Sequence, residues 1–544
     1  MIEKGDIVAS VIAAFKERGF TYAGRSSTND FVLIGPLHTS EGSHECVLIL
    51  PRNFDSLPSI SLREVPEVLR PIAPHIDSSG SICYLSKQLV ALDIFDPIGQ
   101  MLGCVDRAEL VLGQLLRNEL IDDLAEEFFA YWGNEKLQCF FDFRIGKQQK
   151  LKSIIDVSCD TKNVVVFVTD DVNRTLKKSK ALGYNPALTH VAERIYTKVE
   201  PRPIQLQWPP VTLGDIVHWQ SSLDPRSCRR IVERVSQAAE RSEDYLTVMI
   251  ESPRFFYAFM VSFRRHDKRP SNAQLRKKSV LLSSLVVPLR GWRIDEDYII
   301  RRNVPSMKTL EHKKIVLVGC GTIGGYLADM LVKAGAGAGT GELVLIDSDI
   351  LGAGNLGRHR LGFSYIGHEK ADALRDELKR DMPDAKIRSF AVDVRDANVA
   401  NADLIIDATG EQTVSDYIAS RHASTEQLNV WIEGPGVAVR ALIRRNKNEA
   451  CVQCLTRLVR QGQHATVVEK VPKVYAGYGC ENEYVPFPAS VSMQAACLAS
   501  EMVMDWVAGK NSPGLRTQVI SRAFTKSQED CTLMKTADCP ACST

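Results

Sequence analysis

The chain has 544 residues, and its 67 lysine and arginine residues nearly balance its 66 aspartate and glutamate residues, giving a formal net charge of +1. This balance provides no overall field that would favour nucleic acid or an anionic membrane. No apolar run approaches the length needed to span a bilayer, and the acidic, amphipathic start is unlike a signal peptide, so a cytoplasmic location is expected. The length predicts two to four domains. The 14 cysteines indicate metal binding or thiol chemistry rather than a disulfide scaffold.

The first part of the chain predicts a helix followed by a β meander. A helix is expected at residues 6–18, and strands are expected at 31–34 and 46–50. Prolines then mark a turn, a further strand and a loop that presents Cys83 beside Gly80. Later helices are expected near residues 107–116 and 120–132. In the second of these, Leu124, Phe128 and Tyr131 would share one face and pack in a core.

The residues around Cys83 resemble the active site of the ubiquitin-conjugating fold. In that family a histidine, proline, asparagine, isoleucine motif precedes the active cysteine, and Ile76 lies seven residues before Cys83, as the family's isoleucine does. Gly80 and Ile82 also match. His75 stands where the family's asparagine steadies the oxyanion, and a histidine could donate the same hydrogen bond. The resemblance implies a thioester on Cys83. A buried structural cysteine, or a degenerate copy of the domain that only binds, remains the alternative.

The middle of the chain predicts a mixed α/β connecting domain. Strands are expected at residues 139–143, 164–169, 245–251 and 256–263, with a helix near 224–239. Prolines between residues 201 and 210 mark a loop or an internal boundary. The basic run 264–278 has no interleaved aromatic side chain, so we interpret it as an exposed flexible loop rather than a nucleic-acid site.

A glycine-rich turn follows in the last third of the chain. Residues 315–318 predict a buried parallel strand, Gly319, Gly321 and Gly324 have GxGxxG spacing, and apolar residues then repeat at helical period. Such a turn lets backbone N–H groups approach a phosphate at a helix N-terminus. The next strand ends on Asp347, whose carboxylate could accept ribose hydroxyls. A nucleotide-free turn and a nicotinamide-dependent dehydrogenase would show the same pattern.

The charged residues that follow favour a triphosphate over a dinucleotide. Splitting ATP needs cations on the phosphates and an acid for magnesium, and Arg358, Lys370 and Asp407 have those chemical types. Asp407 is expected at the carboxyl end of a further strand. For each charged residue alone, a solvated surface side chain is the alternative.

With these residues the sequence resembles the adenylating domain of ubiquitin-activating enzymes and of the bacterial molybdopterin and thiamin sulfur-carrier adenylyltransferases. The matching motifs are GCGTIG, IDSD, NLGR, GHEK and DATG, in the family's order. The resemblance implies ATP as substrate, with Asp347 on the ribose, Asn355 and Arg358 on the phosphates, Lys370 near the α-phosphate and Asp407 on Mg²⁺. His359 replaces a frequent glutamine. The family's acid and asparagine are missing after the threonine of DATG.

Two cysteine pairs near the C-terminus have metal-ligand spacing. Cys451 with Cys454 and Cys539 with Cys542 form two CxxC turns, which together could complete a tetrahedral, structural zinc site. The adenylating family often carries such a site here.

Between the two pairs lies Cys480, in the region where the family's crossover segment carries the cysteine that attacks the adenylate. A glycine- and tyrosine-rich loop leads from Cys480 into an apolar helix, whose start would favour a thiolate. We expect Cys497, on that helix, and Cys320, in the glycine turn, to be buried packing residues.

The whole chain resembles the bacterial activating and conjugating fusion proteins of CBASS anti-phage operons. The prediction is an α/β multidomain chain, with an α+β ubiquitin-conjugating-like domain at 1–135, a mixed α/β linker domain at 136–300 and a Rossmann-like adenylating domain with a zinc site at 301–544.

That resemblance implies activation of a protein C-terminus ending in a small residue, its transfer from Cys480 to Cys83, and conjugation to a lysine. The substrate would be a cyclic-oligonucleotide synthase. A homodimer is implied, in which Arg301 or Arg302 reaches the neighbour's site. The alternatives are a sulfur-carrier or small-molecule adenylyltransferase with an N-terminal docking module, and a nicotinamide-dependent oxidoreductase.

Overall fold

The computed structural model describes residues 4–70, 73–77, 79–85, 92–120, 123, 128, 132, 137–144, 150–156, 164–203, 208–264, 268–302, 304–474, 476 and 484–542. The chain forms two compact units. The first consists of Met1–Phe143, Lys147–Val172 and Pro186–Arg293, and the second of Arg144–Gly146, Asn173–Asn185 and Ile294–Thr544. The predicted α/β class is confirmed by three separate sheets with their helices. Among the described helices, none is long and apolar enough to cross a membrane.

The N-terminal part is a four-stranded antiparallel meander in the order β1-β2-β3-β4. Side chains of β2 alternate between the core and the outer face, as a half-buried strand requires. The predicted first helix and the strands at 31–34 and 46–50 are confirmed. The helix α2 begins at Pro97 rather than near residue 107, because Asp96 caps its N-terminus by accepting a hydrogen bond from Gly99 N. The elements are α1 (Lys4–Glu17), β1 (Thr21–Arg25), β2 (Phe31–Thr39), β3 (Gly42–Leu50), β4 (Ser59–Leu62), a 3₁₀ turn (Glu67–Leu69) and α2 (Pro97–Leu116).

The middle of the chain forms a closed barrel of seven strands in the order β10-β11-β5-β7-β6-β8-β9. Both parallel and antiparallel pairs occur, as the mixed α/β prediction expected. Phe128 and Trp132 pack with Trp219 and Tyr257 in a core of stacked and edge-on rings. Leu124 and Tyr131 lie outside the described residues.

The barrel's strands are β5 (Leu137–Asp142), β6 (Leu151–Asp156), β7 (Val164–Thr169), β8 (Leu188–Tyr196), β9 (Tyr245–Glu251), β10 (Phe256–Ser262) and β11 (Leu285–Arg293). The helices of this stretch are α4 (Val172–Ala181), α5 (Leu213–Leu223), α6 (Pro225–Glu240), α7 (Asn272–Leu275) and α8 (Lys278–Leu282).

The expectation of a flexible loop at residues 264–278 is wrong for its described part. Ser271 caps the short helix α7, and α8 follows at Lys278. The guanidinium of Arg269 donates hydrogen bonds to the carbonyl oxygens of Ala239 and Glu243, so that side chain is anchored on the body of the barrel. The Ser271 cap is a local capping box with Gln274, whereas the Arg269 contacts join residues 26 and 30 positions apart, which the charge pattern could not reveal.

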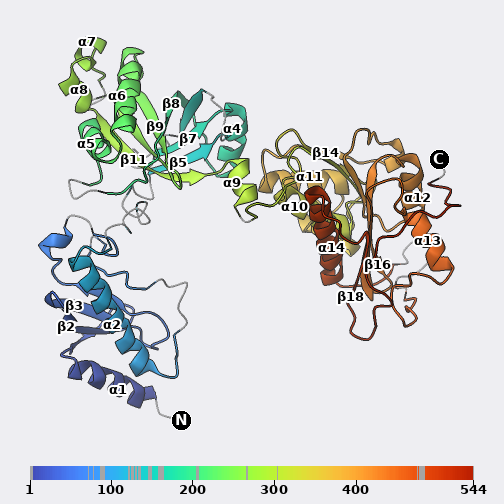
Figure 1. The fold of residues 1–544 in the computed structure, drawn as a ribbon, viewed down its shortest axis with the longest axis horizontal. Helices are drawn as coiled ribbons and strands as arrows, with labels where there is room; N and C mark the ends of the chain where they lie inside the picture. Colours follow the sequence, from blue (N-terminus) through green and yellow to red (C-terminus); the bar gives the residue numbers. More distant parts are fainter. Residues whose placement is uncertain are drawn as a thin grey trace. The chain divides into compact units, whose positions relative to one another are not determined.

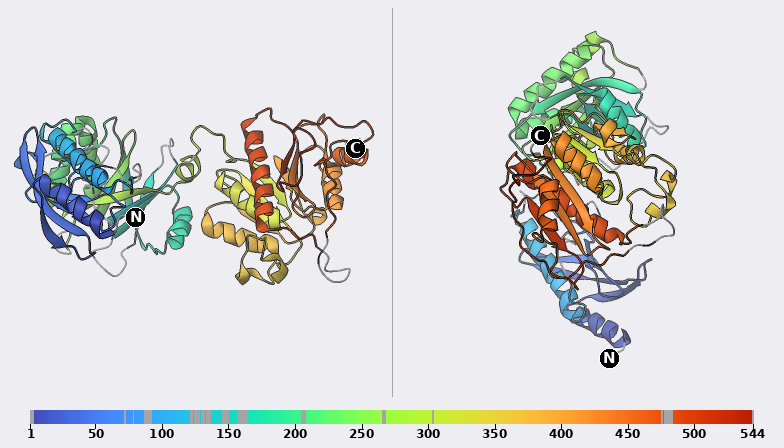
Figure 2. Two further views of the ribbon diagram at one scale, coloured as in Figure 1. Left: turned by 90° about the horizontal axis from the view of Figure 1, so that it is seen from below. Right: turned by 90° about the vertical axis from the view of Figure 1, so that its right-hand side faces the viewer.

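The second unit is built on a seven-stranded sheet in the order β14-β13-β12-β15-β16-β17-β18. The first five strands are parallel and the last two antiparallel. Helices α10 and α14 pack beside each other on one face, and α12 packs on the other (Figures 1 and 2). The arrangement is a doubly wound sheet, whose ligands characteristically bind at the carboxyl ends of the parallel strands.

The strands of the second unit are β12 (Lys314–Val318), β13 (Glu342–Ile346), β14 (Ile387–Phe390), β15 (Leu404–Asp407), β16 (Glu426–Glu433), β17 (Ala438–Arg444) and β18 (Leu515–Val519). The helices are α9 (Glu296–Arg301), α10 (Thr322–Lys333), α11 (Lys370–Asp381), α12 (Gln412–Arg421), α13 (Val452–Arg460) and α14 (Ala489–Ala508). Short 3₁₀ turns span Ala353–Asn355, Phe363–Tyr365 and Val394–Asp396.

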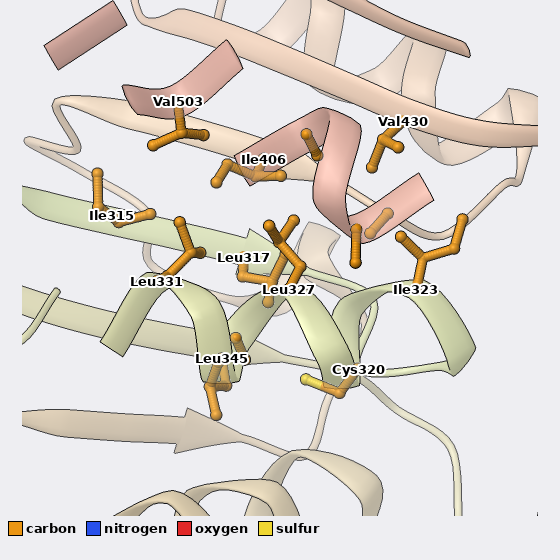
Figure 3. Packing of buried hydrophobic residues seen from close by; sticks show 14 of the residues in the cluster. Ile315, Leu317, Cys320, Ile323, Leu327, Leu331, Leu345, Ile406, Val430 and Val503 are labelled. Atoms are coloured by element: carbon orange, nitrogen blue, oxygen red, sulfur yellow. The ribbon is translucent and has the colours of Figure 1, made fainter. Parts of the chain in front are cut away.

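The central strand β12 is buried on both faces, which explains its unbroken apolar run. Ile315 and Leu317 pack toward α10 and α14 with Leu327 and Val503 (Figure 3). Val316 and Val318 pack on the opposite face with side chains of α12. A strand covered on both sides needs apolar residues at every position, so the predicted parallel strand at 315–318 is confirmed.

Candidate active site

The glycine turn between β12 and α10 needs two of its glycines for packing and leaves the third facing open space. Gly319 has φ +87°, and a Cβ there would lie 2.8 Å from the backbone nitrogen of Thr409. A Cβ on Gly324 would lie 1.8 Å from the carbonyl oxygen of Gly319. A Cβ on Gly321 would meet no atom within 4 Å. Gly321 is therefore the position where the backbone is open to a ligand.

A polar cavity of about 180 Å³ opens beside this turn. Gly319, Gly321, Asp347 and Lys370 all line it, so the fold brings together residues that are 51 positions apart in the sequence (370 minus 319). Its cationic side chain, Lys370, is only 8% exposed and donates to Asp349 at 2.7 Å. A buried ammonium next to the glycine turn is suited to an anion, because little water competes for its charge.

Asp347 orients the turn as well as lining the cavity. Its carboxylate accepts hydrogen bonds from the backbone nitrogens of Cys320 at 2.6 Å and Asp349 at 2.8 Å. Burial raises the pKa of Asp347, while these hydrogen bonds and nearby Lys370 act in the opposite direction. The predicted ribose contact stays a prediction.

A second, larger cavity of about 620 Å³ lies next to the first. Its walls are mostly apolar, with Trp431, Glu433 and the deeply buried Arg440 supplying polar groups. Arg440 is 2% exposed and donates to Thr466, Thr517 and the carbonyl oxygen of His464. Both cavities are lined by Gly321, Ala408 and Thr409, which form a common wall. The two cavities are therefore neighbours beside the glycine turn.

Asp407 lies at the end of β15, as predicted, and lines the larger cavity, where hydrogen-bond donors surround its carboxylate; the predicted magnesium contact stays a prediction. The side chain is 3% exposed. One carboxylate oxygen accepts from the nitrogen and hydroxyl of Thr409, at 3.0 and 2.7 Å, and the other accepts from the Ser415 hydroxyl and from Asn429 Nδ2 at 2.9 Å. A carboxylate offers about four acceptor sites, and these four donors fill them.

Neither Asn355 nor Arg358 lines either of the two cavities described above. Asn355 accepts from Gly352 N through its side-chain oxygen and so caps a 3₁₀ turn. Arg358 donates to the carbonyl oxygen of Val485 at 2.9 Å and stacks on the ring of Phe487 at 4.2 Å. Their predicted phosphate contacts stay predictions.

His359 connects the following loop to the glycine turn. Its Nε2 lies 2.9 Å from the carbonyl oxygen of Cys320, and its Nδ1 accepts from Leu361 N at 3.0 Å. These partners imply that the proton is on Nε2. Burial lowers the pKa of His359, so the neutral ring is favoured.

In the N-terminal part, Cys83 is exposed, which does not support the alternative of a buried structural cysteine. Its backbone nitrogen donates to the carbonyl oxygen of His75 at 2.7 Å, so the two predicted residues are adjacent in the fold. His75 has φ +60°, and its Nε2 lies 3.0 Å from a carboxylate oxygen of Asp123. The two side chains are 24% and 41% exposed, so solvent still reaches the pair.

The four predicted zinc ligands come together as expected. The ligand atoms of Cys451, Cys454, Cys539 and Cys542 all lie within 4.8 Å of one another, and the hydrogen-bonded sulfur pairs are separated by 3.4 to 3.8 Å. A tetrahedron of sulfur atoms about 2.3 Å from zinc has edges of about 3.8 Å. The cluster could therefore hold Zn²⁺. The hydrogen bond from Cys451, together with those from Thr536, lowers the pKa of Cys454 to about 4.

The other cysteine predictions have mixed outcomes. Cys320 is fully buried, as expected, and burial raises its pKa far above the ordinary value of a thiol. Cys497 is exposed on α14, so the prediction that it fills the core is wrong. It lies between the buried Ala496 and Leu498 on a helix that is covered on one side. Because the sequence around Cys497 is apolar on both sides of the helix, the sequence alone did not show which side is exposed. Cys480 lies outside the described residues.

Sequence reasoning missed several residues that shape the site. Asp349 holds Lys370, and the repeated acid of the IDSD motif could have suggested it. Ser415 and Asn429, which hold Asp407, come from α12 and β16 and carry no local signal. Arg301 is paired within its own chain with Asp297 and Glu311, and its predicted reach into a neighbouring copy stays a prediction.

The chain is similar to known proteins along almost its whole length. Residues 298–542 match the model of the ThiF family, and residues 24–141 match that of the prokaryotic E2 family B. An "ATP-dependent ubiquitin transferase-like protein Cap2" of Pseudomonas aeruginosa (strain BWHPSA011 / Pa011) is 43% identical over 542 residues, covering 98% of both chains. A protein of the same name from Escherichia coli (strain TW11681) is 26% identical over 86% of both chains. The molybdopterin-synthase adenylyltransferase of Escherichia coli (strain K12) is 26% identical over 50% of this chain and 99% of its own length.

Proposed function

Because the chain belongs to the Cap2 family of ATP-dependent ubiquitin transferase-like proteins, we propose that it activates a protein C-terminus and passes it along two of its own cysteines to an amine. The enzyme combines ATP-dependent adenylation with activating- and conjugating-like transfer. The observation that carries the proposal is the common wall of Gly321, Ala408 and Thr409 between a small polar cavity and a larger apolar one. Adenylation needs this arrangement, because two substrates must meet at one atom.

In this proposal ATP occupies the polar cavity. Its phosphates would lie against the open backbone at Gly321, its ribose near Asp347, and its α-phosphate within the field of Lys370. Asn355 and Arg358 would contact the phosphates, which requires Arg358 to leave the carbonyl oxygen of Val485. ATP is expected to enter as its Mg²⁺ complex, because the triphosphate needs further positive charge.

The extended tail of the protein substrate occupies the apolar cavity in this scheme. Its last residue would be small, because the carboxylate has to reach the wall at Gly321. A carboxylate oxygen attacks the α-phosphorus, the bond to the β-phosphate oxygen breaks, and pyrophosphate leaves. The products are an acyl-adenylate and pyrophosphate, so the carboxyl group has gained a good leaving group.

Two sulfur atoms then carry the acyl group. The Cys480 thiolate attacks the acyl carbon and AMP leaves. The Cys83 thiolate attacks the resulting thioester and the Cys480 thiolate leaves. An amine, expected to be a lysine, attacks the second thioester, loses a proton to solvent and forms an amide while the Cys83 thiolate leaves. His75 would donate a hydrogen bond to the oxyanion during the steps at Cys83.

The biological setting that we propose follows from the family resemblance. The substrate is a cyclic-oligonucleotide synthase of an anti-phage operon, its C-terminus is joined to a target protein in the cytoplasm, and the enzyme acts as a homodimer. The domain limits proposed for these tasks are 1–135, 136–300 and 301–544. The four C-terminal cysteines would hold Zn²⁺ in a structural role, because four thiolates leave no open position for chemistry.

The first test is ATP/pyrophosphate exchange with the purified full-length chain and candidate carrier proteins. Exchange that depends on the carrier's free C-terminal carboxylate is expected. A carrier with an amidated C-terminus is the matched control, because it fills the tail cavity without a nucleophile. No exchange with any cognate operon protein would refute activation of a protein tail.

The second test follows the thiols on non-reducing gels. Cys480→Ser should abolish both thioester adducts, and Cys83→Ser should leave an adduct on Cys480 and stop conjugation. Cys497→Ser is the matched control, because Cys497 is exposed and close in sequence to Cys480. If Cys497→Ser removed the first adduct and Cys480→Ser did not, the acceptor would be Cys497.

A sulfur-carrier adenylyltransferase with an N-terminal docking module is the second candidate. The match of almost the whole length of a molybdopterin-synthase adenylyltransferase favours it. In that case Cys83→Ser would leave product formation intact and the tail would acquire sulfur instead of an amide bond. Mass spectrometry of the carrier's C-terminus distinguishes the two products. The oxidoreductase alternative is set aside, since the chain's relatives are ATP-dependent transferases.

A further inference from the structure

The saturated carboxylate of Asp407 joins three parts of the second unit. Its donors lie in the turn after β15 (Thr409), in α12 (Ser415) and in the neighbouring strand β16 (Asn429). Thr409 in turn accepts from Glu411 N through its hydroxyl oxygen at 3.2 Å. The buried carboxylate of Asp407 therefore holds the turn 408–411 in a fixed position at the end of β15.

This turn is the wall between the two cavities. Ala408 and Thr409 line both of them, and the backbone of Thr409 packs so closely on Gly319 that a Cβ at Gly319 would lie 2.8 Å from Thr409 N. A displacement of the turn would therefore move the phosphate-binding glycine turn and both cavities together. The place where a carboxylate meets an α-phosphate is defined by this contact.

We propose that Asp407 is a positioning residue for adenylation, acting through Thr409, and not a ligand of the magnesium ion that accompanies ATP. The positioning role rests on the proposed function, because adenylation is the reaction that Asp407 would serve. The exclusion of a metal at Asp407 rests on geometry alone. A metal at Asp407 would have to displace donors from a side chain that is 3% exposed.

The cost of that displacement decides between the two roles. A buried donor left without a partner destabilises the folded chain, and Asn429 and Ser415 are both buried. Magnesium also keeps several waters in a near-octahedral shell. Asp407, Ser415 and Asn429 line the larger cavity, but four donors already fill the acceptor sites of the carboxylate, so a metal could bind only after a donor had left.

The experiment compares metal binding with turnover in the full-length chain. Asp407→Asn replaces an acceptor oxygen by an amide nitrogen that faces donors. Ser415→Ala removes one donor and leaves the carboxylate in place. For each variant, Mn²⁺ binding in the presence of α,β-methylene ATP is measured by electron paramagnetic resonance, and tail-dependent pyrophosphate exchange is measured in parallel.

We expect both variants to bind Mn²⁺ with the affinity of the parent chain, and exchange to slow by about tenfold to 100-fold through a lower kcat, because misplacement at the wall affects the reacting geometry. The thermal midpoint of Asp407→Asn should also fall. If Asp407→Asn weakens Mn²⁺ binding tenfold or more, or if Ser415→Ala tightens it by freeing an oxygen, Asp407 is a metal ligand and the inference is overturned.

The Ser415→Ala variant keeps the test decisive if Asp407→Asn does not fold. Failure of the proposed function is a separate outcome. If the parent chain itself shows no tail-dependent exchange, the reaction assigned to the site is wrong. The Mn²⁺ measurement still decides whether Asp407 binds metal.

Discussion

An added methyl group should have different effects at two glycines of the same motif: it should lower stability at Gly324 and lower ATP affinity at Gly321. Gly324→Ala places a Cβ 1.8 Å from the carbonyl oxygen of Gly319, a backbone atom that cannot move aside. Overpacking of this kind costs about 1–3 kcal/mol. For a domain of this size, each kcal/mol lowers the thermal midpoint by about 2–4 °C, so a decrease of about 2–12 °C is expected.

Gly321→Ala should leave stability almost unchanged. Its φ of −73° is open to alanine, and no atom lies within 4 Å of the added Cβ. Replacing glycine at a helix N-cap costs up to about 1 kcal/mol, and the lower entropy of the unfolded chain returns about 0.4–1 kcal/mol. The methyl group would enter the wall shared by both cavities, where the phosphates are expected, so ATP affinity should fall at least about tenfold, or about 1.4 kcal/mol.

Scanning fluorimetry and isothermal titration with ATP measure the two effects on the same samples. Gly352→Ala is a suitable control, since Gly352 has negative φ, an added Cβ there would meet only the Asn355 oxygen at 3.7 Å, and it lines neither cavity. Our interpretation of the turn would be refuted if Gly321→Ala bound ATP normally, or if it lost as much stability as Gly324→Ala.

The remaining predictions concern pH, metal and the conjugating site. Burial lowers the pKa of His359 in the folded protein, so the unfolded chain binds more protons as the pH falls through about 6.5, and the free energy of unfolding decreases toward acid. His359→Gln removes this contribution. Its thermal midpoint should fall less than that of the parent between about pH 7 and about pH 5, and an equal fall would contradict this assignment. Chelation of zinc, or Cys451→Ser, should lower the midpoint and release close to one zinc per chain by elemental analysis; a chain purified without zinc at full stability would disprove the structural role. Asp123→Asn should slow both the loading of Cys83 and the discharge of its thioester to hydroxylamine by roughly tenfold, because Asp123 holds His75, which serves both steps. A lower thermal midpoint with unchanged rates of both steps would indicate a merely structural pair.

The regular elements were predictable wherever the sequence signal is local. The strand β12 follows from an unbroken apolar run, and α10 follows from its helical period, since both depend on neighbouring residues. The CxxC turns identified all four members of a cluster whose pairs are almost 90 residues apart, because each turn carries its own geometry. Cys497 shows the limit of such signals. Its apolar surroundings suggested burial, but which side of a helix is covered depends on the rest of the fold.

The family, the available chemistry and the order of the parts could be inferred from residue types at fixed spacing, because such patterns recur wherever the same reaction is performed. How those residues are used depends on the folded chain. The fold placed Ser415 and Asn429 around Asp407, fixed Arg358 on the segment 484–487, and set two cavities against one wall. The contact of Arg358 with Val485 spans 127 positions and that of Asn429 with Asp407 spans 22, and Ser415, only eight positions after Asp407, reaches it from a different element. Such contacts depend on how the whole sheet packs, so the local sequence around each residue does not predict them.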